Sequence, residues 1–479
     1  MVQLVIHEDI FAPVLQGEIT LFDNIGLFDY LPISGNEKLT VQFYSYGYSP
    51  DHNENIDFIW RTFDILMVTN VTAPNDYTKR YTLVFASPEL KLNECTMISK
   101  AWGPNVTISN VVASIMTGDN VITNLTDPAG LGYSQTPNPL TLEYTYRSPF
   151  LTSNDVEQNY VDTGSTANAT EVFVEKTKTI EPYIAIPYMK PFEAIKWMAS
   201  RAIRNCAGLY PTTVSANFLF FENKRGFQFV SLTTLLENKQ GTLPKFQFGD
   251  AKQNLDPVWK LNRIETLRIE DCYNILSNIN NGVYASRLFT YEMSTGVLTT
   301  NDFDYLKQFP LNESMDRSAP PATTKDFPQI AIDAAGTNPL TQMPLAKRML
   351  IPVSHIRTKD NTTGADSTRF NSADTQVGAE QYLQARMSQL AKLGDFRVLV
   401  EVAANSEHKV GDLVELDLKM WNLTNATPEL GEIAHKYYSG NYLITSIRHV
   451  LTNFEYKMHI EMVKDSLLAQ IGPVPTDQF

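Results

Sequence analysis

The stretch 439–464 constrains the fold more than any other part of the sequence, because it has the pattern of a long β-hairpin. In its second half, apolar and charged residues alternate with a period of two, as in a strand with one buried face. The apolar set is Tyr456, Met458, Ile460 and Met462, and the charged set is Lys457, His459 and Glu461. The first half is apolar at its start and polar at Arg448 and His449, which predicts an inner strand that is wetted at its far end. The hairpin therefore requires an apolar partner face.

The size and composition of the chain indicate a globular protein with several domains. At 479 residues it is too long for one core, since single cores stop growing at about 250–300 residues, and roughly two to four domains are expected. Its 43% hydrophobic and 19% charged residues are typical of folded chains. The net charge of −14 argues against a surface that binds nucleic acid by neutralising phosphates, although it allows DNA to pass nearby.

The cysteines and the apolar segments indicate in which cellular compartment the protein is expected. Cys95, Cys206 and Cys272 are odd in number and widely spaced, so they form neither a disulfide framework nor a zinc ribbon, which favours a reducing environment. The N-terminus has no basic region followed by an apolar stretch, and no run of about 18 apolar residues occurs. We therefore expect a protein that is neither conventionally secreted nor inserted in a membrane.

The first part of the chain predicts an antiparallel sheet or barrel. Four segments show apolar residues in alternation, with polar connections and no helical period between them. The apolar positions are Ile19 and Leu21; Leu39, Val41 and Phe43; Phe63, Ile65 and Met67; and Tyr81, Leu83 and Phe85.

The middle of the chain predicts helices, a hairpin and an insertion. The predicted elements are a helix of residues 108–116 ended by Gly118, a helix that begins at Pro191, a hairpin of residues 218–221 and 226–232, and a helix of residues 375–393 capped by Gly394. Residues 126–179 are interpreted as loops and short extended pieces, and residues 310–372 as an insertion or extended arm, because both are rich in Pro and Thr.

The last part returns to strands and repeats the order of the first. Residues 396–402 and 414–418 alternate as strands before the hairpin, and this spacing predicts a divergent duplication of roughly 70 residues. The predicted fold is mainly β with some α (α+β) and has two antiparallel β-barrel domains. The expected division is 1–88, first barrel; 89–256, intervening α+β domain; 257–300 with 394–466, second barrel; 301–393, insertion with an extended arm and a helix; 467–479, C-terminal tail.

Motifs that would indicate an enzyme are missing or incomplete. Asp162-Thr163-Gly164 matches the catalytic triplet of aspartic proteases, but those enzymes need two such carboxylates and the sequence has one copy, so we interpret it as a loop. There is no Gly-x-Ser-x-Gly elbow, Gly-rich phosphate loop or His-Glu-x-x-His. Nothing in the sequence points to a pair of glycosidase carboxylates. We predict no enzyme activity and no catalytic or cofactor-binding residues.

Two further groups have a functional and a structural interpretation. His449 and His459 lie on successive predicted strands and form a conceivable cross-strand metal pair, but no third ligand is visible, and we interpret them as strand residues at a barrel surface or subunit contact. Trp197, Phe192 and Met198 are the apolar stripe of a helix, which lines a pocket or, more commonly, packs in a core. We predict no metal site.

Several stretches resemble the baseplate hub (tail hub) proteins of tailed bacteriophages, which are related to the hub part of contractile injection system spikes. They are Gly411-Asp-Leu-Val-Glu-Leu, Tyr438-Ser-Gly-Asn-Tyr-Leu-Ile-Thr-Ser-Ile-Arg-His, Met462-Val-Lys-Asp, Ile6-His-Glu-Asp-Ile-Phe-Ala-Pro, Leu31-Pro-Ile-Ser-Gly-Asn-Glu-Lys, Pro191-Phe-Glu-Ala-Ile-Lys-Trp and Phe220-Phe-Glu-Asn-Lys-Arg-Gly-Phe. The similarity covers most of the chain except the Pro/Thr-rich stretches.

The resemblance implies a structural virion protein with two tail-tube-like barrels per chain. Three chains would then present six similar barrels to a six-fold tail tube and three-fold symmetry to a central spike. The implied partners are the tail tube protein and the spike protein, with the tape measure protein and baseplate wedge as further contacts. The implied location is the tail baseplate of the virion, assembled in the host cytoplasm, with a channel for DNA. If acidic residues line that channel, they repel phosphates.

Two other functions stay open at this point. One is a tail-associated peptidoglycan hydrolase, and the other is a tail protein that binds a receptor or carbohydrate through aromatic residues on loops.

Overall fold

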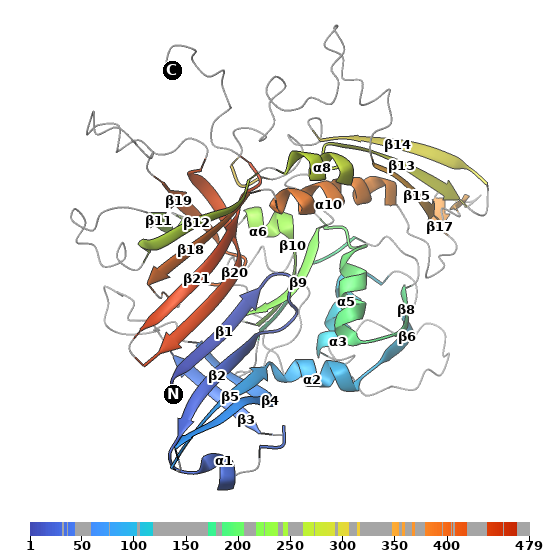
Figure 1. The fold of residues 1–479 in the computed structure, drawn as a ribbon. Coiled ribbons are helices and arrows are strands. Elements are labelled where there is room, and N and C mark those ends of the chain that lie inside the picture. Colours follow the sequence, from blue (N-terminus) through green and yellow to red (C-terminus); the bar gives the residue numbers. More distant parts are fainter. Residues whose placement is uncertain are drawn as a thin grey trace, which may run out of the picture.

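The computed structural model describes the chain in segments, which Figure 1 draws as coiled ribbons and arrows. Strands predominate in these segments, which confirms the predicted mainly β character. The described residues are 1–30, 33–35, 37–43, 59–75, 77–102, 106–117, 171–178, 184–205, 217–224, 226–237, 243–247, 262–272, 274–292, 296–305, 314–316, 347–353, 357–359, 366–368, 379–394, 396–403, 405, 408–418, 438–453 and 455–466.

One large sheet organises the molecule. It has 11 strands, most of which follow one another in the order β12-β18-β21-β20-β1-β2-β5-β4-β3. On a short branch, β19 pairs with the start of β20, and β11 pairs with β19 in parallel. The bounds are β1 Gln3–Asp9, β2 Gln16–Asp23, β3 Lys38–Phe43, β4 Ile59–Asn75, β5 Thr78–Ala86, β11 Lys245–Gln247, β12 Ile264–Cys272, β18 Phe396–Ala403, β19 Leu413–Asp417, β20 Gly440–Thr452 and β21 Tyr456–Val463.

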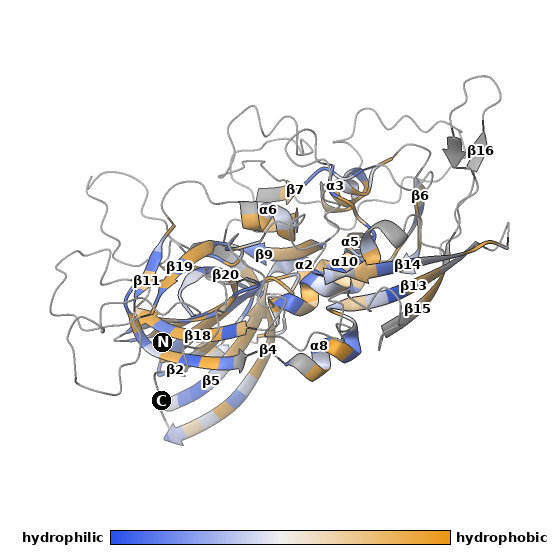
Figure 2. Ribbon diagram, turned by 90° about the horizontal axis from the view of Figure 1, so that it is seen from above, coloured by the Kyte–Doolittle hydropathy of each residue, from blue (hydrophilic) through white to orange (hydrophobic). Residues whose placement is uncertain are grey.

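The hairpin predicted at residues 439–464 is present as β20 and β21, which pair in antiparallel fashion. Met458, Ile460 and Met462 are fully buried and His459 is exposed, so the predicted alternation is confirmed. Figure 2 shows hydrophilic and hydrophobic residues interspersed along β2 and β18 as well. The predicted wetting of the far end of β20 is wrong for His449, which is completely buried against β1.

Strand β1 joins the two strand-rich parts of the chain, and the sequence interpretation did not include it. One edge of β1 pairs with β2, where Leu4 lies opposite Ile19, and its other edge pairs with β20, where Ile6 lies opposite His449. In Figure 1, β1 accordingly lies between the red C-terminal strands and the blue N-terminal ones. We call the β1–β20 pairing the seam.

The predicted pair of separate barrels is not confirmed, because the seam makes one sheet of both sets of strands. In the described part of the chain, no sheet closes into a barrel. The branch strand β11 approaches the start of β12 at one isolated parallel bridge between Gln247 and Arg263. β20 joins the parts because its 13 residues are long enough to pair with β19 at one end and β1 at the other.

Two hydrophobic clusters lie along this sheet. The N-terminal cluster contains Leu4, Ile6, Leu15, Ile19, Val41, Phe43, Phe63, Ile65, Tyr81, Leu83 and Phe85. The C-terminal cluster is built on β18 to β21 and includes Phe246, Val398, Val400, Leu416, Tyr442, Ile444, Ile447, Met458 and Ile460. Met67 was predicted on the buried face but is 53% exposed, because a register shift between Ile65 and Met67 reverses the alternation.

A smaller α+β unit packs beside the sheet and has its own core. The three-stranded sheet β7-β10-β9 shares this core with α3 and α5, and β6 pairs with β8. The helix predicted to begin at Pro191 is present as α5, and the helix of residues 108–116 as α3. The bounds are α1 Leu27–Tyr30, α2 Pro88–Cys95, β6 Ile98–Trp102, α3 Ile108–Thr117, β7 Glu171–Val174, β8 Ile184–Met189, α5 Pro191–Ala199, β9 Phe218–Asn223, β10 Gly226–Ser231 and α6 Leu232–Glu237.

The remaining elements lie near α10, the predicted helix before Gly394. The sheet β14-β13-β15 packs against this helix (Figure 1), and the short pair β16-β17 completes the described part of the predicted insertion. The bounds are α8 Ile275–Asn281, β13 Ala285–Glu292, β14 Leu298–Asp304, β15 Lys347–Val353, β16 Arg357–Lys359, β17 Asp366–Thr368 and α10 Ala379–Leu393. The domain boundaries given above stay predictions.

Gly17 provides a test of how closely β1, β2 and β5 approach one another. A Cβ atom added there would lie 2.4 Å from the carbonyl oxygen of Val5 and 2.6 Å from Cζ of Phe85. We expect Gly17→Ala to lower the free energy of unfolding by about 2–4 kcal/mol, because backbone must move to make room. Urea denaturation measures this loss. Gly394→Ala is the control, since its Cβ would be 3.5 Å from the nearest oxygen; equal losses in both variants contradict the prediction.

Candidate assembly surface

The main path of the large sheet has two open ends, β12 and β3. β12 pairs with β18 on one side, and β3 pairs with β4 on one side. Among the described strands, neither has a ladder on its other side. An unpaired strand edge carries free N–H and C=O groups that can pair with another chain. The two ends are therefore the first candidates for a contact between subunits.

The side chains near the two ends differ in charge. β12 carries Glu265 and Glu270 with Arg268, whose guanidinium lies 3.5 Å from Glu270. β3 begins at Lys38 and continues with uncharged residues. β12 is therefore acidic on balance, whereas β3 carries a single charged residue, Lys38, which lies across from Asp64 on β4.

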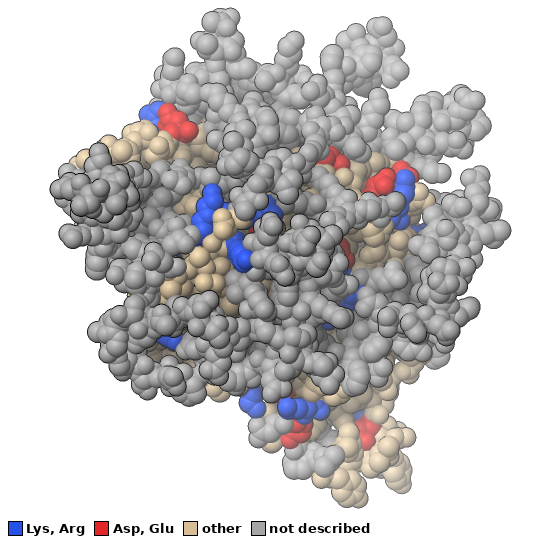
Figure 3. All heavy atoms as spheres, turned by 180° about the vertical axis from the view of Figure 1, so that it is seen from behind, with Lys and Arg blue, Asp and Glu red and all other residues tan. Residues whose placement is uncertain are grey.

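The charged face of the β20–β21 hairpin forms a ladder of ion pairs across three strands. Lys457 Nζ lies 3.0 Å from Glu401 and 3.1 Å from Glu265, and Arg397 lies 3.7 Å from Glu461. The hydrogen bonds of Lys457 to Glu401 and Glu265 raise the pKa of its ammonium group, and the bond from Lys457 lowers the pKa of Glu401. Acidic and basic groups alternate on this face, so it has no strong charge of either sign. Figure 3 shows the same mixture where described residues are visible on the rear of the molecule.

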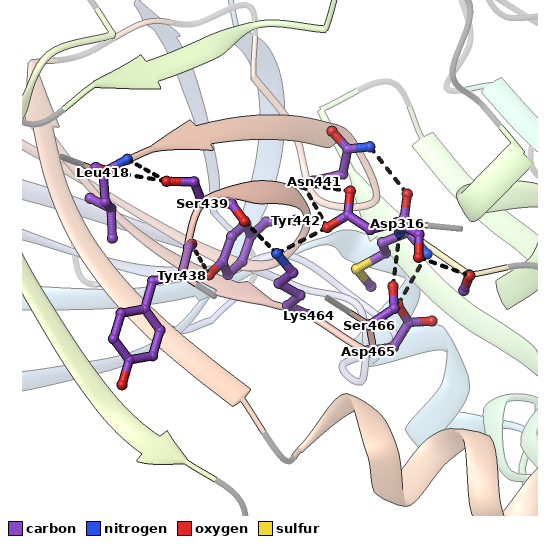
Figure 4. A network of polar contacts seen from close by, with 11 residues as sticks. Asp316, Leu418, Tyr438, Ser439, Asn441, Tyr442, Lys464, Asp465 and Ser466 are labelled. Atoms are coloured by element: carbon purple, nitrogen blue, oxygen red, sulfur yellow. Dashed lines mark hydrogen bonds and ion pairs between the residues drawn. The ribbon is translucent and has the colours of Figure 1, made fainter. Parts of the chain in front are cut away.

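A buried polar network fixes the base of the hairpin to residues 314–316 (Figure 4). Lys464 Nζ lies 2.9 Å from Asp316 Oδ2, and both side chains are nearly inaccessible to solvent. The same ammonium group donates to the carbonyl oxygen of Ser439 at 2.6 Å. Burial lowers the pKa of Lys464, and the charge of Asp316 opposes this shift. An ion pair in a dry site needs such additional bonds to offset desolvation.

The carboxylate of Asp316 and the neighbouring backbone complete this network. The N–H of Asn441 donates to Asp316 Oδ1 at 3.2 Å, and the N–H of Asp316 donates to Ser466 Oγ at 2.8 Å. The N–H of Met315 donates to Asp465 Oδ1 at 3.0 Å. Residues 314–316 fall in the predicted insertion, so the network attaches that part of the chain to both strands of the hairpin.

Glu222 on β9 makes a second attachment, between the α+β unit and the N-terminal strands. Its Oε2 atom accepts the backbone N–H of Leu15 at 2.9 Å and the hydroxyl of Ser87 at 2.5 Å. Leu15 precedes β2, and Ser87 follows β5, so one buried carboxylate holds the ends of two paired strands.

His408 is a buried histidine held in its neutral form. Burial, followed by the charges of Lys224 and Lys409, lowers its pKa from 6.5 to about 3. Its Nε2 atom lies 3.1 Å from Oδ1 of Asn262, and the ring lies 4.9 Å from that of Phe246. This histidine packs the start of β12 against β11 and has no carboxylate partner in the described residues.

The residues singled out in the sequence do not form a catalytic or metal site. His449 is buried opposite Met458, whereas His459 is exposed opposite Arg448, so the two rings lie on different faces of the hairpin. Phe192 and Met198 are buried in the core of the α+β unit, and Trp197 packs against it. The Asp162-Thr163-Gly164 triplet lies outside the described residues.

Two further features are absent from the described residues. No group of three or more His, Cys, Asp or Glu side chains there is arranged to hold a metal ion. No helix in those segments is long and apolar enough to cross a membrane.

The sequence interpretation missed the contact of His449 with Glu8, because the two residues are far apart in the chain and the seam brings them together.

The fold has similar solved structures. A tail protein from Neisseria meningitidis MC58 has a TM-score of 0.45 and 10% identity, over 97% of this chain and 93% of that one. The 43 kDa tail protein of prophage MuSo2 from Shewanella oneidensis has a TM-score of 0.42 and 8% identity, over 97% and 94%. An Escherichia coli component of the type VI secretion system is described as similar to tail proteins of bacteriophage T4. It has a TM-score of 0.36 and 7% identity, over 99% of this chain and 76% of that one.

Two of these proteins are tail proteins and the third is described as similar to tail proteins, and all three TM-scores lie below 0.5. No family model matches the chain, and the comparison with curated proteins finds no match.

The Asp316–Lys464 pair makes a quantitative prediction. We expect Asp316→Asn and Lys464→Met each to cost about 3–5 kcal/mol of stability, because each leaves a buried charge without its partner. The double variant is expected to lose much less than the sum of the two. Chemical denaturation of the four proteins measures the coupling energy. Lys245→Met is the matched control, because its pairs with Glu415 and Asp417 are exposed and cost less than about 1 kcal/mol to remove. Additive losses contradict the prediction.

His408 predicts a loss of stability in acid. Its folded pKa of about 3 lies below the unfolded value near 6.5, so the unfolded chain binds the proton more tightly. The neutral His408 makes its full contribution to the free energy of unfolding above about pH 6.5. This contribution falls by up to about 1.4 kcal/mol per pH unit as the pH falls toward 3. Denaturation of wild type and His408→Gln between pH 4 and 8 measures it. A wild type that loses no more stability than the variant below about pH 6 contradicts the prediction.

Proposed function

We propose that this chain is a structural tail protein that forms a homotrimeric hub between a tail tube and a central spike. The observation that carries the proposal is the continuous sheet, in which two strand-rich parts are joined by β1 and each leaves one open end. Such a protein can add copies of itself through its sheet ends while the joined parts keep a fixed spacing.

The two ends differ, so a contact between β12 of one copy and β3 of the next is heterologous. Heterologous contacts form a closed ring when the rotation between copies closes, and an open filament otherwise. With three copies, each contributing two strand-rich parts, the ring presents six similar surfaces to a tube and three identical ones to a spike. The acidic balance of β12 and the position of Lys38 at the start of β3 favour this pairing.

The proposed partners are a tail tube protein above and a spike protein below, with the tape measure protein and baseplate wedge at the periphery. The proposed location is the tail baseplate of a virion, assembled in the host cytoplasm. The hairpin face is nearly balanced in charge, so it does not supply the acidic lining that we expected from the net charge. A surface whose cations are already paired also offers few free cations to replace the counterions of DNA phosphates, which suits passage of DNA without binding.

Light scattering with negative-stain imaging tests the proposal. We expect a ring with three times the chain mass of 54.0 kDa. Lys38→Glu is expected to raise the concentration at which the ring dissociates at least about tenfold, because like charges would face each other at every contact. Lys196→Glu on α5 is the control with the same charge reversal away from both ends.

Three outcomes contradict this proposal. One is a monomer at high concentration with no ring even beside the spike protein, and another is equal weakening by Lys38→Glu and Lys196→Glu. The third is clearing of cell wall in a zymogram by purified protein, which supports the hydrolase instead.

A further inference from the structure

The sheet β14-β13-β15 ends in a strand edge that has no ladder partner among the described strands. β13 is the central strand, with β14 antiparallel to it on one side and β15 parallel to it on the other. In Figure 1, β14 forms the upper margin of this sheet. The backbone N–H and C=O groups along the free edge of a strand find a full set of partners only in another extended segment.

β14 is less protected than the other open edges described above, β12 and β3, and than β15. Edge strands are commonly protected by charged residues, proline or bulges. β12 has charged side chains and two register shifts, β3 begins at Lys38, and the sequence of β15 contains Lys347, Arg348 and Pro352. The first part of β14, residues 298–301, is Leu-Thr-Thr-Asn, with no charge, no proline and no register shift against β13. Of these four edges, β14 is therefore the one most open to an added strand.

The two faces of this sheet have different surroundings. On one face, Gln384 of α10 donates to Ser286 Oγ at 3.0 Å, and Leu288 is completely buried. Directly paired residues of neighbouring strands point to the same side, so the residues of β14 opposite these two share the face that α10 covers. The other face carries Phe289 and Tyr291, and Tyr291 is 41% exposed.

An apolar stripe crosses this second face and reaches the free edge at β14. The register places Leu350 of β15 opposite Phe289, and Leu298 of β14 opposite Tyr291. Leu350 is 68% exposed and Leu298 is 57% exposed. An added strand would continue the stripe and cover Leu298 from the side, so that one partner would make both backbone and apolar contacts.

β13 shows which kind of strand fits β14. Arg287 donates to both carboxylate oxygens of Asp302, at 2.6 and 2.8 Å, and the aromatic residues Phe289 and Tyr291 follow at alternate positions on the same face. Asp302 is still exposed in this arrangement, and a carboxylate can accept about four hydrogen bonds, so a second cation can approach it. A strand that pairs with β14 therefore presents a basic residue followed by apolar or aromatic ones.

We propose that the free edge of β14 binds an extended segment of another protein by strand addition. The segment lies along β14, with apolar or aromatic residues beside Leu298 and Thr300 and a lysine or arginine beside Asp302. The site does not depend on the proposed hub, whose contacts between copies are at β12 and β3.

The charges favour a different protein over a second copy of this chain. β14 contains no Lys or Arg, so the β14 strand of a second copy supplies no cation for Asp302. Two chains that each carry a net charge of −14 also repel each other. A segment with a basic residue has neither disadvantage.

A synthetic peptide with the sequence of β13, residues 285–292, is the probe, and a scrambled peptide of the same composition is its control. Titration calorimetry with the full chain is expected to give saturable binding of the β13 peptide with a Kd below about 1 mM. Leu298→Lys is expected to raise this Kd at least about tenfold, because an exposed lysine on an edge strand opposes strand addition. Leu350→Lys is the matched control, with the same change on the same face at the opposite edge of the sheet, and it should bind as wild type does.

Hydrogen exchange of wild type shows whether the peptide adds to the sheet. We expect bound peptide to slow exchange in β14 and to leave β13 as protected as before. Loss of protection in β13 means that the peptide replaces this strand, which overturns the proposal. This measurement needs no variant, so it stays decisive if Leu298→Lys does not fold.

Four results of the binding experiments also overturn the proposal. They are no saturable binding up to about 1 mM peptide, equal binding of the scrambled peptide, equal weakening by Leu298→Lys and Leu350→Lys, and a dimer of the protein alone that Leu298→Lys abolishes. The last result, measured by sedimentation, assigns the edge to a second copy. None of the four affects the hub, which is tested by the ring and by Lys38→Glu.

Discussion

The pairing of β1 with β20 is the constraint on which the rest of the structure depends. Within the described sheet, it is the ladder that joins the N-terminal strands to the C-terminal ones. Because side chains alternate between faces, a shift of one residue in this register would move Ile6 out of its core and Glu8 into solvent. The same register therefore sets the alignment of both hydrophobic clusters and the spacing of the two open ends of the sheet.

Charged groups are buried where separate parts of the molecule meet. Glu222 holds the α+β unit to the N-terminal strands, Asp316 with Lys464 holds residues 314–316 to the hairpin, and Glu8 with His449 lies in the seam. Apolar contact alone tolerates many arrangements of two surfaces, whereas a buried polar group is satisfied in few. We infer that these groups fix how the units are oriented, at some cost in stability.

The sequence predicted the elements whose signal is local. The alternation in β21, the Pro191 start of α5 and the helix before Gly394 all follow from neighbouring residues, and each is present. β1 was missed because it is short and apolar on both faces at Leu4, Val5 and Ile6, so it has no alternation to detect. His449 was placed at the surface because its polarity is local information, whereas its burial depends on Glu8 and on β3.

The β20–β21 hairpin has two faces that make different contacts. Its apolar face is committed to the C-terminal cluster, and its charged face is largely self-satisfied through Lys457, Glu401 and Glu265. A face whose ions already pair within one chain gains little from meeting a second charged surface, since each new contact must displace an existing one. Assembly through the strand ends, where backbone groups lack ladder partners, gains a full set of hydrogen bonds by comparison. This difference favours β12 and β3 over the charged face of the hairpin for the proposed contact between copies.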